Sequence, residues 1–193
     1  MEVTNKKLVV AVIGYTGGVG SCLLAAMKRI GLLPHALVRS STMKIGCGVS
    51  EEVPVDYGAL SSYLLKEGGI PVIADVTASS DVQENYEGWL KQGISVVAAN
   101  KGIFAGPEAK YRALLEAAKE GRCRLLHETT VGAGTSANNN DDGTPYRITS
   151  QRSWRMSGSF VSHRLLVRIE RIETCYPTVC VRPSTIPPSV FIL

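Results

Sequence analysis

The 193-residue sequence predicts an α/β fold with a doubly wound parallel sheet. Three observations predict it. Short apolar runs of strand length recur along the first part of the chain, amphipathic stretches of helical length separate them, and a glycine-rich turn follows the first run. Strands that alternate with helices at this spacing are typical of βαβ units, which build parallel sheets.

Five segments are predicted as strands of this sheet. The first, Leu8–Ile13, is apolar throughout, as expected of a strand buried on both faces. The other four are residues 35–39, 71–76, 94–99 and 124–128. Residues 40–54 are rich in Ser and Gly, and we predict that they form a loop.

Helices are predicted between the strands. They cover residues 19–30, 56–67, a segment that starts at Ser80, and 107–120. Gly31 has the position of a left-handed cap residue. Ser80 with Gln83 three residues later matches a capping box. The buried side of the helix that follows is predicted to consist of Val82, Tyr86, Trp89 and Leu90.

The composition changes near residue 137. Residues 138–193 contain 7 Arg, no Lys and 4 acidic residues, and they hold 5 of the 9 prolines. We therefore predict a domain over 1–137 and a linker or irregular tail over 138–193, in which Phe160 to Ile172 alone has the composition of a strand or helix. Two interpretations of the tail stay open: a disordered extension, or sequence foreign to the domain.

Composition argues against several classes of function. A net charge of +4 is mild and does not predict a partner nucleic acid. No apolar run approaches the roughly 18 residues of a membrane span, and no signal peptide precedes the first strand. The 5 cysteines lack metal-binding spacing and predict reduced thiols. We expect a cytoplasmic protein, with a plastid location left open.

The turn after the first strand predicts a dinucleotide site. It comprises Gly14, Tyr15, Thr16, Gly17, Gly18, Val19 and Gly20. Glycines allow a sharp turn, close approach of the backbone to a pyrophosphate and tight helix packing, and the helix amides then face the anion. The order GxTGGxG differs from the common GxGxxG. This pattern favours a Rossmann-type fold; the alternative is a purely structural glycine turn.

The end of the second strand indicates which cofactor binds. Here Arg39 ends the strand and Ser40 and Ser41 follow it, no acidic residue stands among the three, and Lys44 is near. An acidic residue at this point would hold the ribose 2′-OH of NAD, whereas an arginine suits the 2′-phosphate of NADP. We therefore expect NADP(H) in preference to NAD(H). The alternative is a solvated surface arginine.

Three later segments carry a family resemblance. They are DVTASSDV from Asp75, GISVVAANK from Gly93, and ETTVGAG from Glu128 to Gly134. In this order and spacing the chain resembles homoserine dehydrogenase, including the dehydrogenase half of bifunctional aspartokinase–homoserine dehydrogenase, from about Leu8 to Gly134. The resemblance implies NAD(P)H-dependent reduction of aspartate 4-semialdehyde to L-homoserine, in threonine and methionine biosynthesis, by a homodimer.

The resemblance also assigns residues. It places the loop of Thr77, Ala78 and Ser79 at the nicotinamide side of the cofactor, although a simple cap and turn is the alternative. Lys101 matches one of two functional lysines. An ammonium there would stabilise the negative charge that forms on the aldehyde oxygen or supply a proton. Asn100 is expected at the cofactor too, holding the loop by hydrogen bonds.

A monovalent cation, commonly Na⁺, is a further expectation from the family. Its ligands would be the carboxylate of Glu128 and backbone carbonyls of Val131 and Ala133, since hard cations take oxygen ligands. The alternative is a glutamate that only caps the turn. His127, next to it, is expected to be a packed or exposed side chain rather than a ligand.

The resemblance stops after Gly134, where nothing matches the family's substrate and dimerisation domain. Two functions therefore stay open. The first is an NADPH-dependent homoserine dehydrogenase, an oxidoreductase that acts on a small molecule. The second is a truncated, non-catalytic NADP-binding fragment. A third option, another semialdehyde-linked oxidoreductase, is disfavoured because no cysteine stands in a nucleophile setting.

Overall fold

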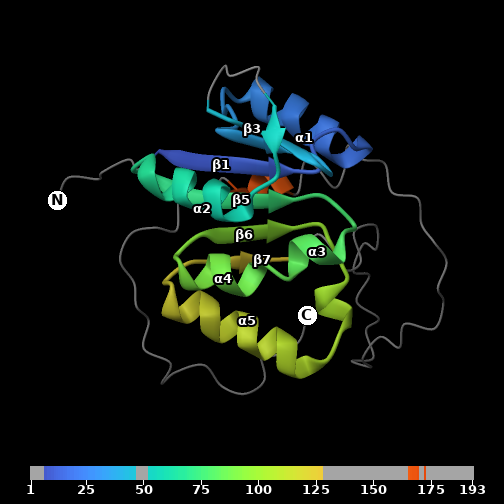
Figure 1. The fold of residues 1–193 in the computed structure, drawn as a ribbon, viewed down its shortest axis with the longest axis vertical. Coiled ribbons are helices and arrows are strands. Elements are labelled where there is room, and N and C mark those ends of the chain that lie inside the picture. The colour runs from blue at the N-terminus through green and yellow to red at the C-terminus, as the bar shows by residue number, and fades with distance from the viewer. Residues whose placement is uncertain (1–6, 47–51, 128–164, 170–171, 173–193) are drawn as a thin grey trace, which may run out of the picture.

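The computed structural model describes residues 7–46, 52–127, 165–169 and 172. Within them, 7 strands form one sheet in the order β4-β3-β2-β1-β5-β6-β7 (Figure 1). The pairs β2–β1, β1–β5, β5–β6 and β6–β7 are parallel. β3 pairs antiparallel with both β2 and β4. The strands are β1 Leu8–Ile13, β2 Ala36–Val38, β3 Thr42–Ile45, β4 Val53–Pro54, β5 Ile70–Asp75, β6 Ser95–Ala98 and β7 Leu125–Leu126. The α/β, Rossmann-type sheet predicted from the sequence is confirmed.

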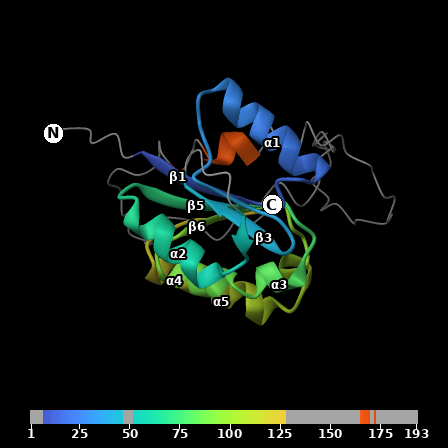
Figure 2. The same cartoon turned by 45° about the horizontal axis from the view of Figure 1, so that its top comes forward.

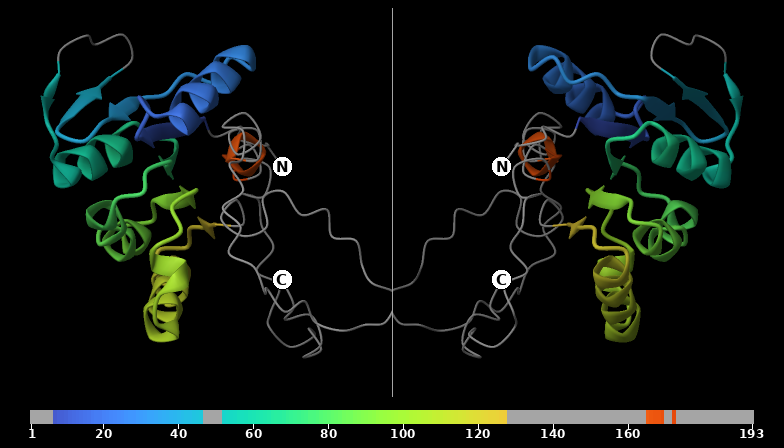
Figure 3. Two further views of the ribbon diagram at one scale, coloured as in Figure 1. Left: turned by 90° about the vertical axis from the view of Figure 1, so that its right-hand side faces the viewer. Right: turned by 90° about the vertical axis from the view of Figure 1, so that its left-hand side faces the viewer.

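Helices cover both faces of the sheet. They are α1 Gly18–Arg29, α2 Tyr57–Lys66, α3 Ser80–Gln83, α4 Tyr86–Lys91, the 3-10 helix η1 Ile103–Ala105 and α5 Glu108–Glu120. Figures 2 and 3 show α2, α4 and α5 on one face, and α1 with a helical segment near residue 165 on the other. In the described ranges, no helix is long and apolar enough to cross a membrane.

β1 is the fourth of the seven strands of the described sheet and lies between β2 and β5, with which it pairs in parallel. All six of its side chains are buried, and alternate residues point to opposite faces. One set joins the core under α2, α4 and α5, and the other joins the core under α1. This double burial explains why the strand is apolar throughout. Gly31 after α1 has a φ of +75°, which confirms the predicted left-handed cap.

Residues 165–169 and 172 are helical and complete the core on the α1 face. Leu165, Leu166, Ile169 and Ile172 are buried in one cluster with Val10, Val12, Leu23 and Met27, among others. The segment lies inside the range 138–193, which the sequence analysis assigns to the tail, and inside the one run that it marks as a strand or helix. The boundary between domain and tail stays a prediction.

The prediction of a loop over residues 40–54 is wrong in part. Thr42–Ile45 pairs antiparallel with β2, and Val53–Pro54 extends the same sheet edge. The backbone turns tightly between β2 and β3, where Arg39 N donates to the carbonyl of Thr42 at 2.9 Å. Strands this short show no reliable alternation in sequence, and their stability comes from pairing with a strand already in place.

The predicted capping box at Ser80 is also wrong. Ser79 occupies the N-cap position without a side-chain cap bond, and Ser80 is the first residue of α3. The Gln83 side chain turns inward and donates to Asn100 instead. The helix then breaks into α3 and α4, yet the predicted buried set is confirmed: Val82, Tyr86, Trp89 and Leu90 are all buried.

Candidate cofactor-binding site

The predicted site residues follow strands whose carboxyl ends lie at one edge of the sheet. Ile13 is in register with Val38 on one side and with Asp75 on the other, and Asp75 is in register with Ala98. The turns after β1, β2, β5 and β6 therefore emerge side by side. Open parallel sheets bind their ligands at this edge.

Two glycines of the first turn are required by the backbone itself. Gly14 has a φ of +87°, and a Cβ there would lie 2.7 Å from the Thr77 methyl carbon. A Cβ on Gly20 would lie 2.3 Å from the Gly14 carbonyl oxygen. By contrast, a Cβ on Gly18 would meet no heavy atom within 4 Å. The turn thus needs glycine for folding at its ends but not at Gly18.

The start of α1 leaves its amides available. Gly17 is the N-cap and provides no side-chain cap, and the first turn holds no acidic residue. The first intrahelical bond runs from Ser21 N to the Gly17 carbonyl at 2.8 Å. The amides of Gly18, Val19 and Gly20 precede that bond and have no acceptor within the helix. Tyr15 is half-buried and Thr16 is exposed. Such a helix start attracts an anion.

A buried carboxylate organises the turn after β5. Asp75 is fully buried, and its Oδ1 accepts from the Thr77 amide at 2.8 Å and the Thr77 hydroxyl at 2.7 Å. Its Oδ2 accepts from the Tyr86 hydroxyl at 2.6 Å and from Asn100 Nδ2 at 3.1 Å. Burial and the nearby Asp75 charge raise the pKa of Tyr86 far above its usual value. The phenol therefore stays a donor, and the loop is fixed by four hydrogen bonds.

Asn100 joins the turns after β5 and β6. Its Nδ2 also donates to the Ser79 carbonyl at 2.9 Å, and its Oδ1 accepts from the Gly102 amide at 3.3 Å and from Gln83 Nε2. The Thr77 hydroxyl accepts from the Ser79 amide at 3.2 Å. These are the contacts expected of a residue that holds the loop of Thr77, Ala78 and Ser79. Its contact with the cofactor stays a prediction.

Sequence reasoning missed three residues that position this loop: Asp75, Gln83 and Tyr86. In the sequence, Asp75 belongs to a family motif, Gln83 to a predicted capping box and Tyr86 to an apolar helix face. One signal was present. An aspartate that ends an otherwise apolar parallel strand must find several donors when it is buried, and the residues after neighbouring strands are the nearest source of them.

Lys101 follows Asn100 at the same edge. It is exposed, and its carbonyl accepts from the amide of Ala105, the last residue of η1, at 3.1 Å. Within the described part of the chain, its ammonium takes part in no ion pair. The structure thus brings Lys101 to the predicted edge, and its chemical role stays a prediction.

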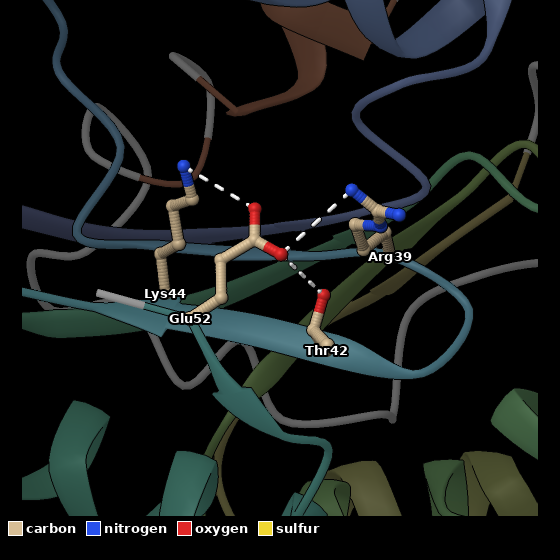
Figure 4. A network of polar contacts seen from close by, with 4 residues as sticks. All are labelled: Arg39, Thr42, Lys44 and Glu52. Atoms are coloured by element: carbon tan, nitrogen blue, oxygen red, sulfur yellow. Dashed lines mark hydrogen bonds and ion pairs between the residues drawn. The ribbon is translucent and has the colours of Figure 1, made fainter. Parts of the chain in front are cut away.

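The end of β2 holds a charged network that the sequence analysis did not foresee (Figure 4). Glu52 Oε2 lies 3.7 Å from Arg39 Nη1 and accepts from the Thr42 hydroxyl at 2.9 Å, and Glu52 Oε1 lies 3.4 Å from Lys44 Nζ. Ser40, the residue after Arg39, is exposed. No acidic residue follows β2 directly in the sequence, but the pairing of β2 with β3 and of β3 with β4 brings Glu52 to Arg39 in space.

The predicted cation ligands Glu128, Val131 and Ala133 lie outside the described residues. Among the residues that are described, no three His, Cys, Asp or Glu side chains cluster around a possible metal position. His127 packs as expected: its ring stacks on Phe104 with centroids 4.3 Å apart, and its Nε2 lies 3.0 Å from the Tyr111 hydroxyl. Burial, mainly, lowers the pKa of His127.

Cys123 is not in a nucleophile setting. Its Sγ donates to the Leu90 carbonyl at 3.2 Å, and burial raises the pKa of the thiol to about 11. A protonated thiol is a poor nucleophile at neutral pH.

Comparison with known proteins identifies the family. The family described as homoserine dehydrogenase, NAD binding domain, matches residues 16–128. Homoserine dehydrogenase of Emericella nidulans is 36% identical over 75 residues, which cover 39% of this chain and 20% of that protein. Homoserine dehydrogenase of Paracoccidioides brasiliensis is 29% identical over 156 residues, covering 68% of this chain and 42% of that protein.

A bifunctional protein is also similar in sequence, and a solved structure is similar in fold. A chloroplastic bifunctional aspartokinase/homoserine dehydrogenase of Zea mays is 35% identical over 86 residues, covering 44% of this chain and 9% of that protein. The fold matches a hyperthermophilic archaeal homoserine dehydrogenase in complex with NADPH, with a TM-score of 0.53 at 22% identity, covering 66% of this chain and 46% of the other.

The chain spans between 9% and 42% of the length of these curated relatives. Its glycine-rich turn, its parallel sheet and the turns after β5 and β6 all fall within or beside the matched residues 16–128. This chain belongs to the homoserine dehydrogenase family through its NAD-binding domain.

Proposed function

We propose that this chain binds NADP(H) and acts in the NADPH-dependent reduction of aspartate 4-semialdehyde to L-homoserine. The observation that carries the proposal is the convergence of two features at one sheet edge: the uncapped start of α1 and the loop of Thr77, Ala78 and Ser79, which Asp75 and Asn100 hold in place. A related archaeal enzyme with this fold was solved with NADPH, which supports the proposal.

The residues present suit a dinucleotide. The turn from Gly14 to Gly20 would hold the pyrophosphate on the amides of Gly18, Val19 and Gly20. Arg39 and Ser40 would lie at the adenosine ribose, and their donors suit a 2′-phosphate. NADPH, when bound, supplies a hydride. Because the turns after β1, β2, β5 and β6 emerge side by side, the chain can contact both ends of such a molecule.

Lys101 is the proposed catalytic residue. Hydride addition to an aldehyde puts negative charge on its oxygen, and an ammonium at the sheet edge stabilises that charge or donates a proton. Lys101 is exposed and directly follows Asn100, whose side chain is anchored to Asp75. The anchored asparagine fixes the backbone from which the lysine extends.

Two further parts of the proposal come from the family resemblance. Glu128 and the carbonyls of Val131 and Ala133 would hold a monovalent cation such as Na⁺. The active protein would be a homodimer.

Titration of the 193-residue chain with NADPH and NADH in a calorimeter tests the binding, and NADPH oxidation with aspartate 4-semialdehyde tests the reaction. Lys101→Met should lower kcat by about a hundredfold or more, with a smaller effect on NADPH affinity. Lys110→Met is the matched control, because Lys110 is another exposed lysine, on α5, and it should leave both quantities unchanged.

The outcomes separate the two functions left open by the sequence. Turnover that depends on Lys101 supports the enzyme. NADPH binding without turnover supports a dinucleotide-binding function alone. A folded chain that binds neither nucleotide contradicts both.

A further inference from the structure

Glu52 is held by three partners at the position where the sheet would meet the adenosine ribose (Figure 4). Its Oε2 lies 3.7 Å from Arg39 Nη1 and accepts from Thr42 Oγ1 at 2.9 Å. Its Oε1 lies 3.4 Å from Lys44 Nζ. Both cations that favour a 2′-phosphate here therefore already share one carboxylate.

The sheet register produces this arrangement. Leu37 pairs with Lys44 across β2 and β3, and Met43 pairs with Val53 across β3 and β4. Continuing the antiparallel register by one residue puts Glu52 opposite Lys44. Side chains that face each other across antiparallel strands lie on the same side of the sheet and interact. Figure 4 shows all four side chains of the network extending to one side of the ribbon.

The network is charged and accessible. The side chains of Arg39, Lys44 and Glu52 are 46%, 30% and 33% exposed, so a solute can reach the cations. The hydrogen bond from Thr42, followed by contact with Lys44 and Arg39, holds the pKa of Glu52 below its usual value. The group is a carboxylate at neutral pH. Exposed ion pairs are weak, so another anion is able to replace it.

We propose that Glu52 is a specificity-determining residue, an internal counter-anion that competes with the 2′-phosphate of NADPH for Arg39 and Lys44. The inference rests on the proposed NADP(H) binding. A 2′-phosphate that reaches either cation is repelled by the carboxylate and must displace it, which costs affinity. The 2′-OH of NADH carries no charge and can instead donate to the carboxylate. Glu52 therefore reduces the ratio of NADPH affinity to NADH affinity that Arg39 raises.

Glu52→Gln tests the proposal, because the amide keeps the shape and a hydrogen-bond acceptor for Thr42 but removes the charge. We expect NADPH to bind about fivefold more tightly, since two exposed ion pairs no longer compete with it. NADH affinity should stay the same or fall. Calorimetry on the 193-residue chain gives both dissociation constants, and their ratio is the measured quantity.

Glu87→Gln is the matched control. Glu87 on α4 is an exposed glutamate whose Oε1 lies 2.7 Å from Lys91 Nζ, and α4 lies on the other face of the sheet. This variant changes the net charge equally and should leave the ratio of the two constants unchanged. Thermal unfolding of each variant confirms that it folds.

Three results would overturn the inference. In the first, both nucleotides bind, but Glu52→Gln leaves the ratio of the NADPH and NADH dissociation constants unchanged or weakens NADPH binding. Glu52 then does not compete with the 2′-phosphate, and the proposed function stands. If Glu87→Gln shifts the ratio equally, net charge alone is the cause. If neither the native chain nor the variant binds a nucleotide, the proposed function fails and this inference fails with it.

Discussion

Replacing Gly20 with alanine puts a methyl group inside the glycine-rich turn. An added Cβ would lie 2.3 Å from the Gly14 carbonyl oxygen, and 2.6 and 2.8 Å from the Cα and carbonyl carbon of Tyr15. Unstrained carbon contacts need about 3.5 Å or more, so the clash is roughly 1 Å deep. All three atoms belong to the backbone and cannot move aside by changing a rotamer. The turn or α1 itself must shift.

The expected cost is about 3 kcal/mol of unfolding free energy, the upper part of the range for overpacked sites. For a chain of this size it corresponds to a fall in Tm of about 6 to 12 °C. Thermal and urea unfolding, followed by circular dichroism, measure it. NADPH affinity should fall as well, because the shifted amides no longer converge on one anion.

Gly18→Ala is the control. No heavy atom lies within 4 Å of its added Cβ, so stability should stay the same or rise by about 0.5 kcal/mol as the unfolded chain loses freedom. If the proposed pyrophosphate site is right, the methyl group still weakens NADPH binding by filling the space the ligand needs. Gly20→Ala with native stability would refute the packing argument, and Gly18→Ala with native affinity would refute the placement of the pyrophosphate.

Three further predictions concern groups away from this turn. Tyr86→Phe should cost about 2 kcal/mol of stability in urea unfolding, because the buried Asp75 carboxylate loses a 2.6 Å hydrogen bond; an unchanged midpoint would contradict its anchoring role. Burial, then the charge of Lys7, lowers the pKa of His35, whose neutral Nδ1 accepts from a β1 amide at 3.4 Å. As the pH falls, the unfolded state therefore binds a proton at His35 before the folded state does. The contribution to the free energy of unfolding is fully present above about pH 6.5 and declines as the pH falls below it. His35→Gln should reduce the difference in the free energy of unfolding between pH 7.5 and pH 5.5, measured from unfolding curves at both pH values. Ile169→Asp should lower the free energy of unfolding by about 4 kcal/mol or prevent folding, because it buries an unpaired charge. Val167→Asp, at a half-buried position, should lower it far less. Equal effects of the two variants would show that the segment does not pack on the sheet.

Much of the site was predictable because its signals are local. The turn from Gly14 to Gly20 is recognisable from a strand, a set of glycines and an amphipathic helix that are contiguous in the chain. The loop of Thr77 to Ser79 and the pair Asn100 and Lys101 each directly follow an apolar run. In a parallel sheet all carboxyl ends lie at one edge, so identifying the strands was enough to bring these residues together.

The remaining features depend on contacts between distant segments. Asp75 accepts hydrogen bonds from Tyr86 and Asn100, which approach it from other elements. The neighbouring residues in the sequence do not show that these donors will meet at Asp75. Glu52 reaches Arg39 only through the register of two very short antiparallel strands. Such strands carry too few residues for a pattern to be read.

The sequence by itself determined the five parallel strands, the helices between them, the glycine turn and the family, because periodicity and backbone freedom are properties of contiguous residues. Only the tertiary structure decided which charge faces Arg39, what anchors the loop after β5, and that residues 165–169 cover the sheet beside α1. Those facts arise from pairing and burial between segments that are far apart in the chain, and no local pattern encodes them.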